Sequence, residues 1–141
     1  MGKLLQRLSD ATRSGVYRVR DADAVLEAVQ GSAIRVARIG LSGASEKAGL
    51  MERIARALDF PQWFGGNWDA LEDCLTDLSW LKAEGHVLVF EDAGRIPADE
   101  RGVLVDILAS SAAFWAERKR PFFAVFVGGA PRLPELYREK R

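Results

Sequence analysis

Cysteine, histidine and long apolar runs are nearly missing from this sequence. The single cysteine, Cys74, has no partner for an internal disulfide and fits a reducing compartment, and we interpret it as a small buried helix residue. His86 is the only histidine, so the clusters of His and Cys that bind transition metals are missing and no metal site is predicted. No apolar run reaches the length of a membrane span or a signal-peptide core, which favours a cytoplasmic protein.

The net charge is zero, but the charges are unevenly distributed along the chain. Residues 59–100 hold ten acids and only two bases, Lys82 and Arg95, so this region carries −8 and the remainder +8. Such segregation predicts an acidic surface that attracts a basic partner. Overall neutrality argues against general nucleic-acid binding, and we expect no direct contact with nucleic acid or with a membrane.

Strand and helix patterns alternate along the chain after an N-terminal amphipathic turn or two and a loop over residues 1–14. Apolar patterns predict strands over residues 15–20, 33–39, 86–91 and 122–127. Capping residues and helical spacing predict helices over residues 21–30, from about 46 to 58, from 68 onward and over 98–119. The last two apolar runs are nearly continuous, as in strands buried on both faces of a parallel sheet. This order predicts one α/β domain with a small parallel β-sheet flanked by helices.

The stretch from Asp59 to Leu81 combines aromatic and acidic residues. It contains three of the four tryptophans and five acids, but no base. An aromatic turn leads into a helix for which Asn67 is a favoured N-cap residue. At about 100° per residue, the apolar side of this helix is formed by Trp68, Leu71, Leu75 and Leu78. The opposite side is formed by Asp69, Glu72, Asp73, Thr76 and Asp77. Acids three and four residues apart repel one another, so this acidic side requires a functional explanation.

The same stretch carries a resemblance to a known family. The run PQWFGGNWDALEDCL, from Pro61 to Leu75, is similar without a gap to the signature of the barstar family, the intracellular inhibitors of barnase-type ribonucleases. The resemblance implies a barstar-like domain over residues 33–128. We expect residues 1–32 to add a strand and a helix packed on that domain, and residues 129–141 to form a charged tail.

The resemblance also implies which residues contact a partner. The second aspartate of the signature enters the nuclease active site in the family, and the first contributes at the rim. These two positions map onto Asp73 and Asp69. The expected partner-binding residues are Trp63, Phe64, Gly65, Asn67, Asp69, Glu72, Asp73 and Glu117.

Two positions depart from the family pattern. Glu72 stands where the best-known barstar has a tryptophan, so an apolar contact becomes an extra charge. The family also contributes an acid from a later helix, and Glu117 is a counterpart only across a gap in the alignment. These departures suggest a different nuclease partner or weaker affinity for barnase.

Three functions follow from these patterns. The first is a non-enzymatic ribonuclease inhibitor that is a monomer when free and needs no cofactor. The second is a barstar-fold interaction module whose partner is not a nuclease, an alternative favoured by residues 1–32 and by Glu72. The third, a hydrolase using Asp69 and Asp73, is disfavoured because neighbours on one exposed helix turn differ little in burial.

Overall fold

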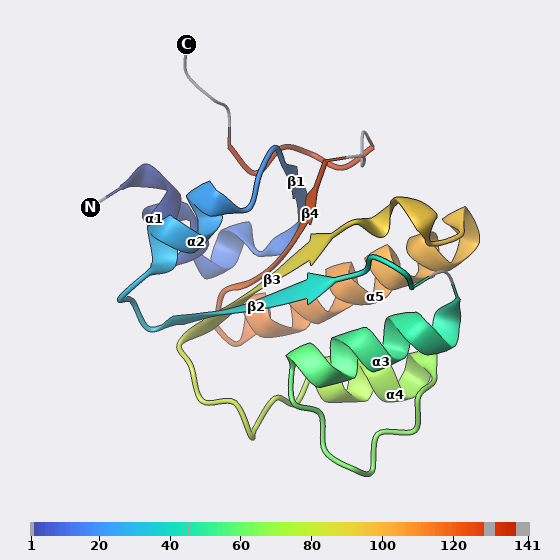
Figure 1. The fold of residues 1–141 in the computed structure, drawn as a ribbon. Helices are drawn as coiled ribbons and strands as arrows, with labels where there is room; N and C mark the ends of the chain where they lie inside the picture. Colours follow the sequence, from blue (N-terminus) through green and yellow to red (C-terminus); the bar gives the residue numbers. More distant parts are fainter. Residues whose placement is uncertain (1, 45, 129–131, 138–141) are drawn as a thin grey trace.

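The computed structural model describes residues 2–44, 46–128 and 132–137, which form three layers (Figure 1). The middle layer is a sheet in the order β1-β4-β3-β2, and every neighbouring pair is parallel. The strands are β1 (Gly15–Val19), β2 (Ile34–Gly40), β3 (Gly85–Glu91) and β4 (Phe122–Val127). This arrangement confirms the predicted α/β fold with a small parallel sheet.

Helices cover both faces of the sheet (Figure 1). One face packs against α3 (Lys47–Ala57), α4 (Trp68–Leu75) and α5 (Ala98–Glu117). The other face packs against α1 (Lys3–Leu8) and α2 (Asp23–Val29). Two short 3-10 helices, η1 (Ala11–Arg13) and η2 (Ala93–Arg95), complete the regular structure of the described residues. None of the helices in those residue ranges combines the length and hydropathy that a membrane crossing needs.

The central strands β3 and β4 are buried on both faces. Leu88 and Phe90 lie in the core beneath α3, α4 and α5, while Val87 and Val89 lie in the core beneath α1 and α2. Alternate residues of a strand point to opposite faces, which places these neighbours in two different cores. The nearly continuous apolar runs predicted for these strands therefore reflect burial from both sides, as in other parallel sheets.

The N-terminal residues contain more regular structure than their sequence predicts. The expected turn or two is the helix α1, and η1 lies within the stretch that we predicted as a loop. Asp10 holds η1 in place, because its carboxylate accepts hydrogen bonds from the backbone N and the side-chain hydroxyl of Thr12. Gly31 follows α2 with a φ of 79°, a left-handed conformation that suits glycine after a helix.

Segments outside residues 33–128 pack against one face of the sheet. Leu8 of α1 and Val25 of α2 are fully buried against it, and β1 pairs with β4 along its length. Residues 132–137 also dock here, where the Leu136 backbone N donates to the Arg18 carbonyl at 3.0 Å. The rest of the tail predicted over residues 129–141 lies outside the described residues.

Candidate partner-binding site

The candidate site is built on α4, and Asn67 starts this helix as predicted. The Asn67 side-chain oxygen Oδ1 accepts a hydrogen bond from the Ala70 backbone N at 2.7 Å. This bond satisfies one of the N–H groups that the first turn of a helix leaves without a partner. Directly before Asn67, Gly66 adopts a left-handed φ of 73°, whereas a Cβ on Gly65 would meet its neighbours at ordinary contact distances.

The apolar side of α4 anchors the helix in the core. Leu71, Cys74 and Leu75 are fully buried, and Trp68 is half-buried against the same core. The prediction that the helical stripe continues to Leu78 is wrong. α4 ends at Leu75, Thr76 caps it, and Leu78 adopts a left-handed φ of 53°. Leu78 is nevertheless buried, because the turn after the helix folds back onto the core.

Two of the predicted acids, Asp69 and Asp73, lie exposed on α4. They are four residues apart on the helix, which places their Cβ atoms about 6 Å from each other. Asp69 is in the first turn, where the helix dipole stabilises a negative charge. Asp73 is in the last turn, where the dipole disfavours a carboxylate, and that turn contains no base. The Asp73 charge therefore does not stabilise α4, and this favours a role for Asp73 in binding a partner.

Glu72 lies apart from these two acids. It is half-buried, and its Oε2 accepts a hydrogen bond at 3.0 Å from the Ser110 hydroxyl of α5. The prediction that it shares the face opposite the apolar stripe is therefore wrong in detail, because Glu72 borders that stripe and faces the neighbouring helix. The carboxylate of Glu72, which departs from the family pattern, thus forms a hydrogen bond within the protein that joins α4 to α5.

An aromatic cluster lies beside α4. Trp63 is 61% exposed, and its ring meets the ring of Trp80 edge to face at a centroid distance of 6.3 Å. Phe64 is half-buried against Phe60, with ring centroids 4.9 Å apart. Half-buried aromatic neighbours thus hold the loop against the core, and Trp63 presents its surface to solvent.

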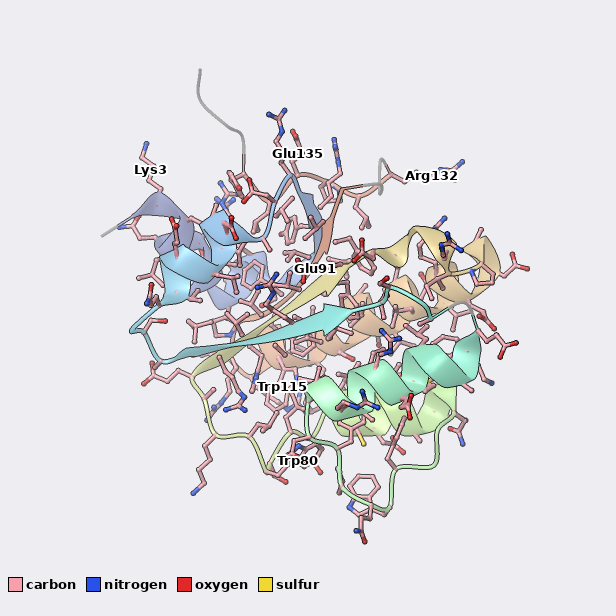
Figure 2. All side chains as sticks on the ribbon, viewed as in Figure 1. Lys3, Trp80, Glu91, Trp115, Arg132 and Glu135 are labelled. Atoms are coloured by element: carbon pink, nitrogen blue, oxygen red, sulfur yellow. The ribbon has the colours of Figure 1, made fainter. Side chains whose placement is uncertain are left out.

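Two tryptophans outside the expected partner-binding residues, Trp80 and Trp115, hold the site in place. Trp80 Nε1 donates to the Leu58 carbonyl at 3.0 Å, and Trp115 Nε1 donates to the Leu75 carbonyl at 2.8 Å. Figure 2 shows both residues on the side of the molecule that carries α3 and α4. The carbonyl that Trp115 binds is one of the last of α4, which has no partner within the helix. Trp80 was within the aromatic stretch of the sequence, but nothing local indicated its contacts.

The structure brings Glu117 to the end of the same helix pair. Glu117 is exposed at the last residue of α5, two residues after Trp115, whose side chain contacts the end of α4. It is also seven residues after Ser110, so it shares the face of α5 from which Ser110 reaches Glu72. The fold therefore positions a late acid near the C-terminal end of α4.

The remaining candidate groups are structural. Cys74 is fully buried, and burial, followed by the charges of Asp73 and Asp77, raises the pKa of its thiol to about 11. Burial, with the charges of Arg35 and Arg120, lowers the pKa of His86 to about 4. Within residues 2–44, 46–128 and 132–137, no group of three His, Cys, Asp or Glu side chains is arranged to hold a metal ion.

Comparison of the sequence with models of protein families identifies the family to which this domain belongs. The family model described as Barstar (barnase inhibitor) matches residues 34–127, from the start of β2 to the end of β4. The chain belongs to the barstar family. A search of curated proteins finds no match.

Proposed function

We propose that this protein is an intracellular inhibitor of a barnase-type ribonuclease and that α4 enters the active site of the nuclease. The observation that supports this role best is the exposed pair Asp69 and Asp73 next to the exposed ring of Trp63, all within the matched residues 34–127. The site would work in the cytoplasm, and the free protein would be a monomer.

The chemistry of the pair suits such a target. A ribonuclease binds the phosphates of RNA with cationic side chains, and two carboxylates one helical turn apart can take the places of two phosphates. Hydrogen bonds between ionised groups are about twice as strong as neutral ones, and they gain further when a pocket excludes water. The charge of −8 over residues 59–100 would also speed the approach of a basic partner.

The other proposed contacts surround this pair. Trp63 would stack on the partner, and Phe64, packed on Phe60, would hold the aromatic loop in place. Gly65 and Asn67 would shape the end of this loop, where it leads into α4. Glu117 would add a charge from the end of α5. We assign Glu72 a smaller direct part, because its carboxylate is already bound by Ser110.

We propose no enzymatic role for Asp69 and Asp73. A catalytic acid and base need different surroundings, so that one is protonated when the other is ionised. Both carboxylates here are exposed on the same helix surface. A recognition surface explains this equivalence better than a catalytic pair.

A second candidate is a barstar-fold interaction module whose partner is not a nuclease. The bond between Glu72 and Ser110 favours it, since the surface beside Asp73 differs from that of a barstar with an aromatic residue at this position. The acidic pair and Trp63 would serve this partner as well, so only the identity of the partner separates the two functions.

The deciding experiment is affinity capture from a lysate of the source organism, followed by an RNase assay. The baits are the parent, the Asp69→Ala/Asp73→Ala variant, and Glu27→Ala as a control that removes an exposed acid from α2 in the opposite layer. We expect the parent and the control to retain an RNase and to silence it, and the double variant to retain none. Equal capture by all three baits would exclude the acidic pair from the site. Capture by the parent and control of a partner without RNase activity would favour the second candidate.

A further inference from the structure

A basic hollow lies at the end of the sheet where β2, β3 and β4 begin, away from the acidic pair. Its volume is about 700 Å³, within the range of sites for small ligands. Three consecutive bases of the turn between α5 and β4 line it: Arg118, Lys119 and Arg120. The rest of its lining comes mainly from α1 and from the start of β2, and includes the apolar residues Leu5 and Ile34.

Hydrogen bonds to the backbone hold two of the three bases in position. Arg118 Nη1 donates to the Phe114 carbonyl at 2.8 Å, and Arg120 Nη1 donates to the Ala83 carbonyl at 2.7 Å. The Arg118 guanidinium also lies 3.5 Å from the centroid of the Phe114 ring. Each guanidinium keeps further N–H groups for a ligand. Among the described residues, none of the three bases forms an ion pair with a carboxylate.

The third base, Lys119, occupies a position where glycine is preferred. The backbone N of Lys119 donates to the Ala116 carbonyl and that of Arg120 to the Trp115 carbonyl, the two bonds of a Schellman motif. Lys119 has a φ of 63°, the left-handed conformation that disfavours residues with a Cβ. Because the backbone at this position favours glycine, a change of Lys119 to glycine removes the side chain without cost to the turn.

The surroundings extend the positive field. A smaller hollow adjoins the first through Gln6, which lines both, and it is lined by Lys3, Arg7 and Arg13. The acid on its wall, Asp10, sets one negative charge against these three positive charges. Glu84 is the acid on the wall of the larger hollow. The region therefore favours an anion.

We propose that the larger hollow binds a phosphorylated small molecule with a flat or apolar body, such as a nucleoside diphosphate. Phosphate oxygens would accept from Arg118, Lys119 and Arg120, because guanidinium and ammonium groups form strong hydrogen bonds with phosphate. The body of the ligand would lie against Leu5 and Ile34. This site is separate from the acidic pair and does not depend on the proposed inhibition.

The test compares a ligand that has both phosphates and a flat body with ligands that have only one of the two. ADP, inorganic pyrophosphate and adenosine are titrated into the full chain by calorimetry at low and at physiological salt. We expect ADP to bind more tightly than pyrophosphate, adenosine not to bind, and the affinity for ADP to fall as salt rises. Equal binding of adenosine and ADP, or no binding of ADP, would overturn the proposal. Tighter binding of a 12-nucleotide RNA, with or without a terminal phosphate, would overturn it in favour of a surface for polyanions.

Lys119→Gly separates binding from folding. Glycine relieves the left-handed strain, so we expect the urea midpoint of unfolding to rise while the affinity for ADP falls about tenfold, the effect of one charged hydrogen bond. The control, Arg95→Ala, removes an exposed base at η2 outside the hollow and should leave ADP binding unchanged. A Lys119→Gly protein that binds ADP as tightly as the parent would remove Lys119 from the site and contradict the proposal.

Discussion

At the scale of single residues, Asp69 and Asp73 differ in their effect on the helix that carries them. The helix dipole stabilises Asp69 in the first turn and opposes Asp73 in the last turn. Removing the Asp73 charge should therefore relieve the helix slightly, whereas a partner with a cationic pocket would lose its main contact.

We predict that Asp73→Ala weakens binding of the captured nuclease by about 2 kcal/mol or more, in the range of interface hot spots. The free energy of unfolding should change by less than about 0.5 kcal/mol, as for other exposed positions. Calorimetric titration of the nuclease and urea denaturation measure the two quantities. A variant that binds as tightly as its parent would remove Asp73 from the contact surface.

His86 is a single residue whose charge state affects folding. It is 8% exposed at the start of β3, and Arg35 and Arg120 add repulsion to the effect of burial. Its pKa is lowered to about 4 in the folded chain, compared with an ordinary value of 6.5. The unfolded chain therefore binds more protons between these values, and stability must fall as the pH drops through that window.

We expect the free energy of unfolding to fall between pH 7 and pH 5 by an amount on the order of 1 to 2 kcal/mol from His86 alone. His86→Gln removes the titrating group, so the variant should lose less stability over the same interval. Urea denaturation of both proteins at the two pH values isolates the difference from the titration of carboxylates. Identical losses would show that His86 does not control this dependence.

At the scale of elements, α4 is too short to be stable alone. It has eight residues, and isolated helices of fewer than about 12 residues are marginal in water. Hydrogen bonds at both ends stabilise this short helix: Asn67 caps its start, and the Trp115 indole donates to the Leu75 carbonyl at its end. The bond from Ser110 to Glu72 joins its middle to α5. The presentation of Asp69 and Asp73 thus depends on contacts from outside the helix.

Asn67→Ala should lower the free energy of unfolding by about 1 kcal/mol, the usual contribution of an N-cap side chain. It should also weaken partner binding, because Asp69 lies in the turn that the cap fixes. Asn67→Asp keeps an oxygen acceptor and adds a charge that the dipole favours, so its stability should match the parent. Chemical denaturation of the three proteins checks this order, and a destabilised Asn67→Asp would contradict the assigned cap.

At the scale of the whole molecule, the N-terminal segments form the second covering layer of the sheet. Without them, the buried faces of β3, with Val87 and Val89, and of β4, with Phe123 and Val125, would meet water. We therefore expect residues 1–32 to unfold together with the matched residues 34–127 in one transition.

Leu8→Ala tests this expectation. Leu8 precedes the matched region in the sequence, but its side chain is fully buried in the core that it shares with β3 and β4. We predict a loss of about 2 to 5 kcal/mol, the range for large-to-small changes in a core. Leu4→Ala, at a half-buried position of the same helix, should cost less. Thermal and urea unfolding measure both. A loss as small as that of Leu4→Ala would show that α1 is not a cooperative part of the domain.

Local patterns in the sequence were enough to predict most elements and the central features of the site. The N-cap bond of Asn67 forms within four residues, and the exposure of Asp69 and Asp73 follows from the helical period. The order of strands and helices predicted a parallel sheet, because parallel strands need crossover connections. The barstar signature lies within one continuous run, so it could be read without a structure.

Only the tertiary structure decided which side chains meet across elements. Glu72 binds Ser110, which is 38 residues away, and Trp115 binds Leu75, which is 40 residues away. The basic hollow likewise combines α1 with a turn more than 100 residues later. The sequence by itself determined the elements, the acidic helix and the family, since these depend on neighbouring residues. The direction of Glu72, the second covering layer and the hollow depend on the packing of distant segments, which no local pattern contains.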